Sequence, residues 1–494
     1  MKNNPRISGF AAGYCQLALL FLIFLSLDVF GQRKATFRAN NKKINIAYFD
    51  KEVAHIMQET GVNGVSLAII SDGRIVYDQA YGYKDAGHES KVDKATVFEA
   101  CSVSKTFLSY AVYKVVDEGK LDLDKPMYEY LPYPPLEHDS RYKQITPRMV
   151  MCHASGIENW KDHNNPDTLE IVTNPGQQFI YSGEGYEYLA KVLETILHEP
   201  YEVYMKRIVF DPLGLPNTFT SFRNGGPDNY AIGHTALGKK IDKWKNLQPV
   251  PAGGINTTAT DYGNFITRMF DEKHLSRKSI NQMLQPLTRL IPGDTTWYFG
   301  PGFEVQYHGN DTIILHGGDN PGFESFICYS VVKKSGIALF TNSERGRAMI
   351  KRIVSMSVGL DVVPTVGSSI AEQYPSPVEP IVQAYKQHKA AGFWTKVAEL
   401  EKKNNGKLPE KTMTELGWIF FTADPPIAKR ILQKNIDTYP EAGGGLFLLG
   451  IFEENNGAYA EALKYFRRAH DLNFVLFPIS PEIKFCEKKL AKHN

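Results

Sequence analysis

Three segments of the chain place a lysine three positions after a serine, which is the spacing of a nucleophile and its base on one helical face. They are Ser102–Lys105, Ser140–Lys143 and Ser330–Lys333. A serine hydroxyl is a weak nucleophile at neutral pH and needs an adjacent base, and a lysine serves as that base only after it has lost its proton. The spacing alone does not choose among the three, because a helix-capping serine followed by a surface lysine has the same pattern.

The surrounding residues favour the first pair. Ser102 opens a segment whose apolar residues recur with helical periodicity until Gly119 stops it. Positions i and i+3 share a helical face, so Nζ of Lys105 can reach Oγ of Ser102, and the free N–H groups of a helix start would assist an oxyanion. Ser330 lies in an expected strand, where positions three apart point to opposite faces, and Ser140 follows a proline-rich loop.

Two β-rich regions far apart in the chain enclose a mostly helical one. Residues 64–83 hold two β-rich runs around Asp72-Gly73, a dipeptide typical of a tight hairpin turn, and a second β-rich region runs from about 303 to 342. Between them, residues 186–197 form one apolar helical stripe. We therefore predict an α/β domain with one antiparallel sheet built from both of its ends, a helical insertion, and a cleft at their junction.

Five segments, in this order, resemble the serine β-lactamase and penicillin-binding superfamily, on its class C and related-esterase side. The resemblance covers about residues 45–360 and implies the β-lactamase/transpeptidase-like fold. Its segments are FEACSVSKTF (98–107), MVMCHASGI (149–157), FIYSGEGYEYLAKVLE (179–194), PAGGINTTATDYGNF (251–265) and ILHGGDNPGFESFICY (314–329).

The resemblance implies a role for each residue that matches the family pattern. Ser102 would be the acylated nucleophile, Lys105 its proton-handling partner, and Tyr181 a second base beside the lysine. The backbone N–H groups of Ser102 and Asp319 would form the oxyanion hole. No metal and no cofactor are implied. His153 and Ser155 fall in a matched loop, where we expect them to shape the loop rather than to react.

Two positions of the substrate-binding part depart from the family pattern. His316-Gly317-Gly318 would line the edge strand against which substrate lies, but His316 stands where many members have lysine, which weakens the positive charge available for a substrate carboxylate. Gly183 stands where the family often has asparagine, so a side-chain amide that orients substrate is missing. Both departures argue against efficient binding of β-lactams or D-Ala-D-Ala and favour an esterase, amidase or peptidase.

We therefore expect a serine hydrolase that works through an acyl-enzyme on a small-molecule or peptide substrate. One alternative is a class C-type β-lactamase or D-Ala-D-Ala carboxypeptidase. Another is a non-catalytic protein that binds penicillin or cell-wall fragments. The formal net charge of +2 gives no case for nucleic acid as a partner.

The first 31 residues have the pattern of a signal peptide. A positively charged start precedes an apolar run at 17–27, and Val29 and Gly31 place modest side chains before a cleavage point at Gln32. The alternative is a membrane anchor, because no charge appears from Ile7 to the end of the apolar run. With either outcome, we expect the rest of the chain to lie outside the cytoplasm, as a periplasmic, secreted or anchored protein.

Four cysteines follow the signal segment, and they are too scattered for a zinc site or a disulfide framework. We expect buried free thiols, with a Cys101–Cys152 bridge as the alternative; the other two are Cys328 and Cys486.

The chain of 494 residues is long enough for two or three domains. In the last part, Gly417 and Gly450 lie 33 residues apart in similar surroundings, which resembles two tetratricopeptide repeats, with a plain helical hairpin as the alternative. Two repeats are few for a solenoid, so we expect them to pack on the main domain or to recruit a protein partner. The expected organisation is a hydrolase domain at 44–362, a Pro- and Ser-rich linker at 363–380, and a helical domain at 381–494 with repeats at 410–442 and 443–476.

Overall fold

The computed structural model describes residues 35–87, 89–161, 167–222, 228–241, 247–290, 294–362, 373–472, 474 and 479–491. The predicted signal peptide at 1–31 lies outside the described residues, as does the part of the predicted linker at 363–372. Among the helices in the described ranges, none is both long and apolar enough to cross a membrane.

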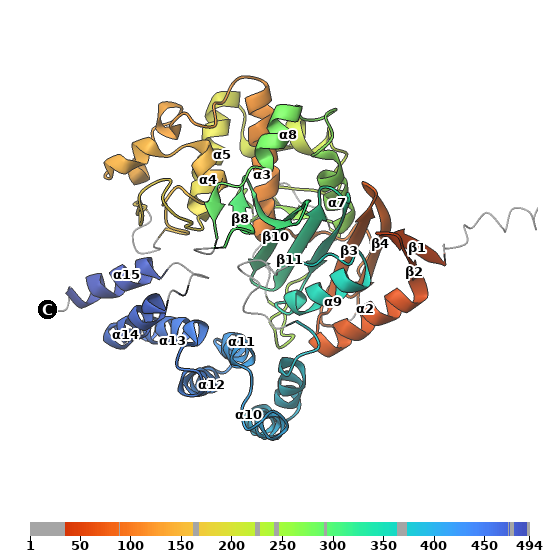
Figure 1. Ribbon diagram of the computed structural model, residues 1–494, viewed down its shortest axis with the longest axis vertical. Coiled ribbons are helices and arrows are strands. Elements are labelled where there is room, and N and C mark those ends of the chain that lie inside the picture. Colours follow the sequence, from red (N-terminus) through yellow and green to blue (C-terminus); the bar gives the residue numbers. More distant parts are fainter. Residues whose placement is uncertain are drawn as a thin grey trace, which may run out of the picture.

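An eight-stranded antiparallel sheet forms the centre of the first domain (Figure 1). Its order is β4-β3-β12-β11-β10-β9-β8-β7, so the early strand β3 pairs with the late strand β12, as predicted. The strands are β3 (Gly64–Ser71), β4 (Arg74–Gly82), β7 (Thr288–Arg289), β8 (Trp297–Gly300), β9 (Phe303–His308), β10 (Asp311–Asn320), β11 (Phe323–Ser330) and β12 (Ser335–Thr341).

The first hairpin forms where the dipeptide predicted it. Asp72 and Gly73 connect β3 to β4 with φ of 51° and 70°. A two-residue turn with both residues at positive φ matches the twist of the strands it joins, and Asp-Gly suits it because glycine carries no Cβ.

Both faces of the sheet are covered, which explains why every residue of β3 is buried. Alternate residues point to opposite faces, so Ala68 and Ile70 join the core beneath the helical insertion, whereas Leu67 and Ile69 join the core on the other face. Two helices cover that second face, α2 (Ile46–Thr60) and α9 (Ile350–Met356), and Figure 1 shows both beside the sheet.

The insertion and the connections supply the remaining elements of this domain. The helices are α3 (Ser104–Asp117), α4 (Pro147–Met151), α5 (Gly183–Leu197), α6 (Tyr201–Met205), α7 (Ala259–Arg268) and α8 (Arg277–Met283), with short turns η1 (Cys101–Val103), η2 (Met127–Glu129), η3 (Pro134–Leu136), η4 (Ser140–Gln144), η5 (Lys206–Phe210) and η7 (Gly346–Met349). The short strands are β1 (Thr36–Ala39), which pairs with β2 (Lys42–Asn45), and β5 (Phe98–Glu99), which pairs with β6 (Asn256–Thr257).

The C-terminal part is helical, as predicted. Its helices are α10 (Val378–Lys403), α11 (Glu410–Phe420), α12 (Pro425–Thr438), α13 (Gly443–Asn455), α14 (Tyr459–Asp471) and α15 (Ser480–Ala491). One boundary differs from the expectation, because α10 starts at Val378 inside the predicted linker. Pro380 does not prevent this, since a proline in the first turn of a helix has no N–H to leave unpaired.

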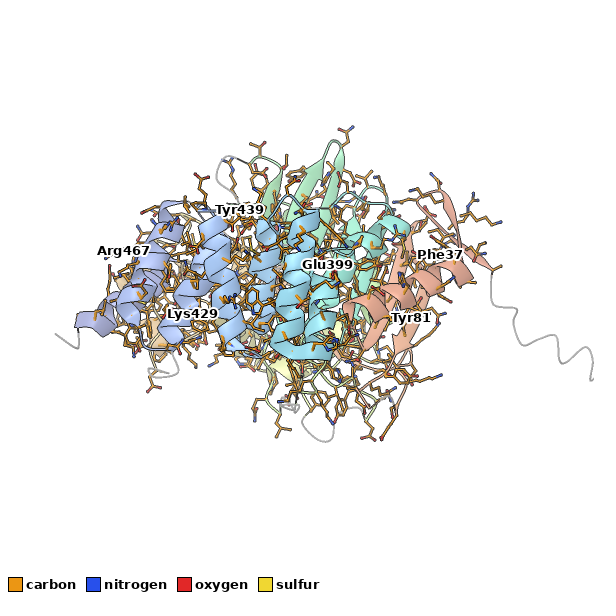
Figure 2. All side chains as sticks on the ribbon, turned by 90° about the horizontal axis from the view of Figure 1, so that it is seen from below. Phe37, Tyr81, Glu399, Lys429, Tyr439 and Arg467 are labelled. Atoms are coloured by element: carbon orange, nitrogen blue, oxygen red, sulfur yellow. The ribbon has the colours of Figure 1, made fainter. Side chains whose placement is uncertain are left out.

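Gly417 and Gly450, which define the repeat spacing, have the same role in helix packing. A Cβ on Gly417 would lie 2.3 Å from Leu432 Cδ2, and one on Gly450 would lie 2.4 Å from Phe466 Cε1. Each glycine therefore lets one helix of a pair approach the next, α11 on α12 and α13 on α14. Figure 2 shows these helices side by side, with Lys429 and Arg467 among them and Phe37 at the other end of the molecule.

Candidate active site

Ser102 and Lys105 meet on a tight helical turn. The 3₁₀ turn at 101–103 runs directly into α3, which begins at Ser104, two residues later than we expected. Side chains three apart eclipse one another in a 3₁₀ turn, and Lys105 Nζ donates to Ser102 Oγ at 3.4 Å. The lysine is fully buried and also donates to the carbonyl oxygen of Ala252 at 2.6 Å.

Cys101, directly before the serine, has a left-handed backbone with φ of 52°. That conformation costs a residue other than glycine about 1–3 kcal/mol, and such residues cluster at functional sites. The buried Cys101 thiol donates to the carbonyl oxygen of Phe323 at 3.6 Å. Burial raises the pKa of this thiol well above its usual range, which disfavours the reactive thiolate.

Tyr181 faces the lysine from the neighbouring helix start. Lys105 Nζ lies 4.8 Å from the centre of the Tyr181 ring, and the His153 ring stacks on the same tyrosine with a centroid distance of 4.1 Å. The backbone N–H of Ser182, the N-cap of α5, donates to His153 Nδ1 at 3.0 Å. Burial, with the Lys105 cation, lowers the pKa of His153 well below its usual range. His153 is therefore a neutral support for Tyr181, which fits the role expected for its loop.

The second half of β10 is open on one side. Residues 311–315 pair with β9, whereas pairing with β11 continues to Asn320, so among the described strands only β11 pairs with His316, Gly317 and Gly318. The expected edge strand is thus only the C-terminal half of β10, whose main chain is available to pair with an extended substrate. A Cβ on Gly318 would lie 2.7 Å from Cys101 Cβ, so glycine lets this edge approach the turn that carries Ser102.

Asp319 follows on the same strand, two residues before the β10–β11 turn. Its carboxylate points to Arg347, whose Nη2 lies 2.5 Å from Oδ2. This ion pair holds the Asp319 carboxylate, and the family pattern assigns the backbone N–H of the same residue to the oxyanion hole.

His316 carries no positive charge at physiological pH. Its side chain is 2% exposed, and burial together with the Lys105 cation lowers its pKa to about 3. Nδ1 lies 2.6 Å from the carbonyl oxygen of Gly317. A lysine at this position would present a fixed cation to a substrate carboxylate, and His316 does not replace that charge.

A tryptophan fills the space beside Gly183, and sequence reasoning missed it. A Cβ on Gly183 would lie 2.5 Å from Trp160 Cη2, so the indole and a longer side chain at 183 exclude one another. The Gly183 backbone N–H donates to Asn159 Oδ1 at 3.0 Å, which holds the tryptophan loop on the start of α5. Trp160 is 50% exposed, an unusual exposure for a large aromatic side chain.

Glu187 is a second residue that sequence reasoning missed. The backbone N–H of Ala252 donates to Glu187 Oε1 at 2.9 Å, and the carbonyl oxygen of the same residue accepts from Lys105. Burial raises the pKa of Glu187 to about 7, and the Lys105 cation opposes that rise. The spacing of four residues from Gly183 along α5 is the signal that could have identified Glu187 as a neighbour of the site.

The other candidate chemistries have little support in the described ranges. Cys101, Cys152, Cys328 and Cys486 are all buried free thiols, so the alternative Cys101–Cys152 bridge is not formed. No group of three or more His, Cys, Asp or Glu side chains within those ranges is arranged to hold a metal ion.

Comparison with known proteins identifies the class. The model of the Beta-lactamase family matches residues 49–356. This match spans more than half of the chain, which therefore belongs to the β-lactamase family. It is a family of serine hydrolases that work through an acyl-enzyme. The resemblance seen in the five sequence segments is confirmed at this level.

Individual relatives are distant. The putative penicillin-binding protein PbpX of Bacillus subtilis (strain 168) is 27% identical over 331 residues, 63% of this chain and 78% of that protein. The D-alanine carboxypeptidase AmpC from Burkholderia cenocepacia has a TM-score of 0.54 at 20% identity and covers 63% of this chain and 97% of its own. The D-amino acid amidase from Ochrobactrum anthropi SV3 has a TM-score of 0.50 at 23% identity and covers 60% and 89%. These structural likenesses show a shared fold.

Proposed function

We propose that the protein is an exported serine hydrolase that cleaves an ester, amide or peptide through an acyl-enzyme on Ser102. The observation that carries the proposal is the burial of Lys105 between the Ser102 hydroxyl, the Ala252 carbonyl oxygen and the Tyr181 ring. A surface lysine after a helix cap would not be enclosed in this way. The family match supports hydrolase chemistry at the level of the class.

The proposed reaction has two steps. Ser102 Oγ attacks the substrate carbonyl carbon while its proton passes to Lys105 or Tyr181, and the backbone N–H groups of Ser102 and Asp319 stabilise the oxyanion. The proton then moves to the leaving group, which departs as an alcohol or an amine. Water, deprotonated by the same pair, attacks the acyl-enzyme and releases the acid with regeneration of Ser102.

The recognition side of the cleft supports an uncharged substrate with an apolar acyl group. His316 is neutral, so a carboxylate on the substrate would find no fixed cation there. The Trp160 indole stands in place of a side-chain amide at 183 and offers an apolar surface instead. The open edge of β10 adds main-chain pairing, which an amide or peptide uses better than a simple ester.

The test compares the purified protein with its Ser102→Ala variant. Each is incubated with a chromogenic short-chain ester, a chromogenic cephalosporin and a fluorophosphonate that labels active-site serines. Ester turnover that disappears in the variant supports the proposal. Cephalosporin turnover of similar efficiency would support the class C-type β-lactamase or carboxypeptidase alternative. A stable Ser102 adduct without turnover of either substrate would support the non-catalytic binding protein.

Export is part of the proposal and has its own test. The mass of the mature protein, recovered from cells that express the full chain, should correspond to a first residue at Gln32. An intact N-terminus in the membrane fraction would instead indicate an anchor.

A further inference from the structure

A buried arginine of the first domain forms ion pairs with the helical domain. Arg345 follows β12, and its guanidinium forms ion pairs with Glu379 of α10, at 2.6 Å, and with Glu415 of α11. All three side chains are at most 4% exposed. Removing one partner from a buried ion pair leaves an uncompensated charge and is strongly destabilising. The cluster therefore specifies how α10 and α11 dock.

An apolar contact surrounds this ion cluster. Ala236 and Leu237, from the segment at 228–241, belong to the same core as Val378, Ile381 and Tyr385 of α10. The carboxylate of Glu344, next to Arg345, accepts from the Ala236 backbone N–H at 3.1 Å. The docked helices thus hold two segments of the hydrolase domain, 342–347 and 228–241.

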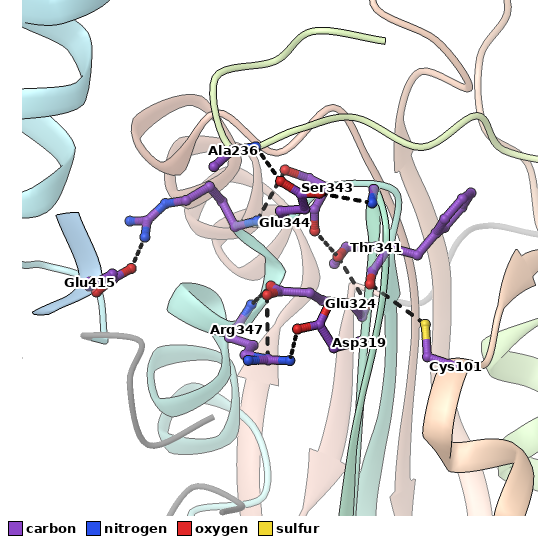
Figure 3. Close-up of polar contacts among 12 residues, drawn as sticks. Cys101, Ala236, Asp319, Glu324, Thr341, Ser343, Glu344, Arg347 and Glu415 are labelled. Carbon is purple, nitrogen blue, oxygen red and sulfur yellow. Dashed lines mark hydrogen bonds and ion pairs between the residues drawn. The ribbon is translucent and has the colours of Figure 1, made fainter. Parts of the chain in front are cut away.

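The same two segments hold the turn of the β10–β11 hairpin. Glu344 Oε1 accepts from the Gly322 backbone N–H at 3.2 Å, and the His234 backbone N–H donates to the Gly322 carbonyl oxygen at 3.2 Å. Arg347 pairs with Asp319 on β10 at 2.5 Å and with Glu324 on β11 at 3.3 Å. Figure 3 shows Glu415, Glu344, Arg347 and Asp319 along this line of contacts.

The hairpin in turn contacts the turn that carries the nucleophile. Ser325 Oγ donates to the Ala100 carbonyl oxygen at 2.7 Å, and Cys101 Sγ reaches the Phe323 carbonyl oxygen. Asn320 Nδ2 donates to Glu99 Oε2 at 2.8 Å and to the Gly253 carbonyl oxygen at 3.1 Å. Contacts therefore run from α10 and α11 to residues 99–101, directly before Ser102, and to Gly253, directly after Ala252.

From these contacts we propose that Arg345 and Arg347 are positioning residues, through which the docked helical domain holds the Asp319 backbone N–H in place for the oxyanion. The proposal rests on the proposed hydrolase function. It gives the C-terminal helices a part in catalysis that needs no partner protein. Neither arginine touches substrate. Since an oxyanion-hole donor acts on the transition state, its displacement should lower kcat more than it changes KM.

The test is a graded series in the full chain: Arg347→Met, Arg345→Met and Arg352→Met as the matched control. Arg352 forms a half-exposed ion pair with Glu52, on the α2 side of the sheet and away from the hairpin. We expect ester kcat to fall about 10²-fold for Arg347→Met and about tenfold for Arg345→Met, with KM within about twofold of wild type. Arg352→Met should match the wild type. Equal kcat in Arg345→Met and Arg352→Met would overturn the proposal.

Two further measurements keep the test decisive. If Arg345→Met does not fold, Arg345→Met with Glu379→Gln and Glu415→Gln removes the unpaired charges and should fold while kcat stays low. Recovery of wild-type kcat in that triple variant would contradict the proposal. If the wild type does not turn over the ester, the rate of Ser102 labelling by the fluorophosphonate replaces kcat. No labelling of the wild type refutes the proposed function, whereas equal labelling of wild type and Arg345→Met refutes only the coupling.

Discussion

The two sides of the candidate cleft differ in how much of the family pattern they keep. The nucleophile side has serine, lysine and tyrosine at the matching positions, and the structure brings Lys105 to Ser102 and to the Tyr181 ring. The recognition side has lost the asparagine and the lysine, and the space beside Gly183 is filled by Trp160. Under the proposed function, bond cleavage and substrate choice therefore depend on different residues, so that substitutions on one side test that side alone.

The largest effect should come from the nucleophile side. We expect Lys105→Met to lower ester kcat about 10³-fold, because it removes one of the two groups proposed to take the proton from Ser102. The control is Lys114→Met on the same helix, whose Nζ donates to the His274 carbonyl oxygen at 2.6 Å and is remote from Ser102. Steady-state kinetics on the chromogenic ester give the answer. A Lys105→Met variant with more than a tenth of the wild-type kcat would remove lysine from the mechanism.

The phenol across from the lysine should matter less. Tyr181→Phe keeps the ring against His153 and loses the hydroxyl, so we expect kcat to fall about 10²-fold while thermal stability hardly changes. Tyr186→Phe is the matched control, since its hydroxyl donates to the Met151 carbonyl oxygen at 2.9 Å inside the core. That variant should lose stability and keep kcat. The reverse pattern, with the kinetic loss in Tyr186→Phe, would contradict the role of Tyr181.

The recognition side is tested by replacing its two unusual residues, Gly183 and Trp160. Gly183→Asn alone should lower ester kcat/KM about tenfold, because the new side chain overlaps the indole. Gly183→Asn with Trp160→Ala relieves the overlap, so its kcat/KM should exceed that of Gly183→Asn. The double variant should also be acylated faster by the cephalosporin than either single variant.

A double-mutant cycle on kcat/KM measures the coupling between the two positions. Trp160→Ala alone should discriminate less between esters with aromatic and acetyl groups. Additive effects of the two substitutions, with unchanged preference for the aromatic ester, would show that the indole does not contact substrate.

The parts of this structure that were predicted from sequence are those with a local period. The β-rich run that forms β3, the Asp-Gly turn and the three-residue spacing of Ser102 and Lys105 depend on backbone geometry within a few residues. Trp160 contacts Gly183 from a loop more than 20 residues earlier in the chain, and no local sequence pattern predicts this contact. The burial of Arg345 could not be predicted from the residues around it, which resemble an ordinary polar loop. Its burial depends on helices that follow more than 30 residues later.

Glu187 illustrates the same limit and leads to the prediction with the smallest effect. Its helix was recognised from the apolar stripe, but its environment depends on Ala252, 65 residues away. Burial raises its pKa to about 7, so the folded protein holds this proton more tightly than the unfolded chain. The resulting stability is fully present below the unfolded pKa of about 4.3 and is lost as the pH rises through about 7.

Glu187→Gln keeps an acceptor for the Ala252 N–H and removes the ionisation. Relative to wild type, the variant should therefore gain about 2.5 kcal/mol of stability between pH 5 and pH 8, as measured by denaturant unfolding at each pH. If ionisation of Glu187 controls the reaction, wild-type kcat/KM should show an inflection near pH 7 that is absent from the variant. Glu194→Gln is the control, since Glu194 accepts the Tyr201 backbone N–H at 2.8 Å further along α5 and should leave the pH profile unchanged. If Glu187→Gln still shows an inflection near pH 7, the inflection belongs to another group. In that case the ionisation of Glu187 does not influence the reaction at Ser102.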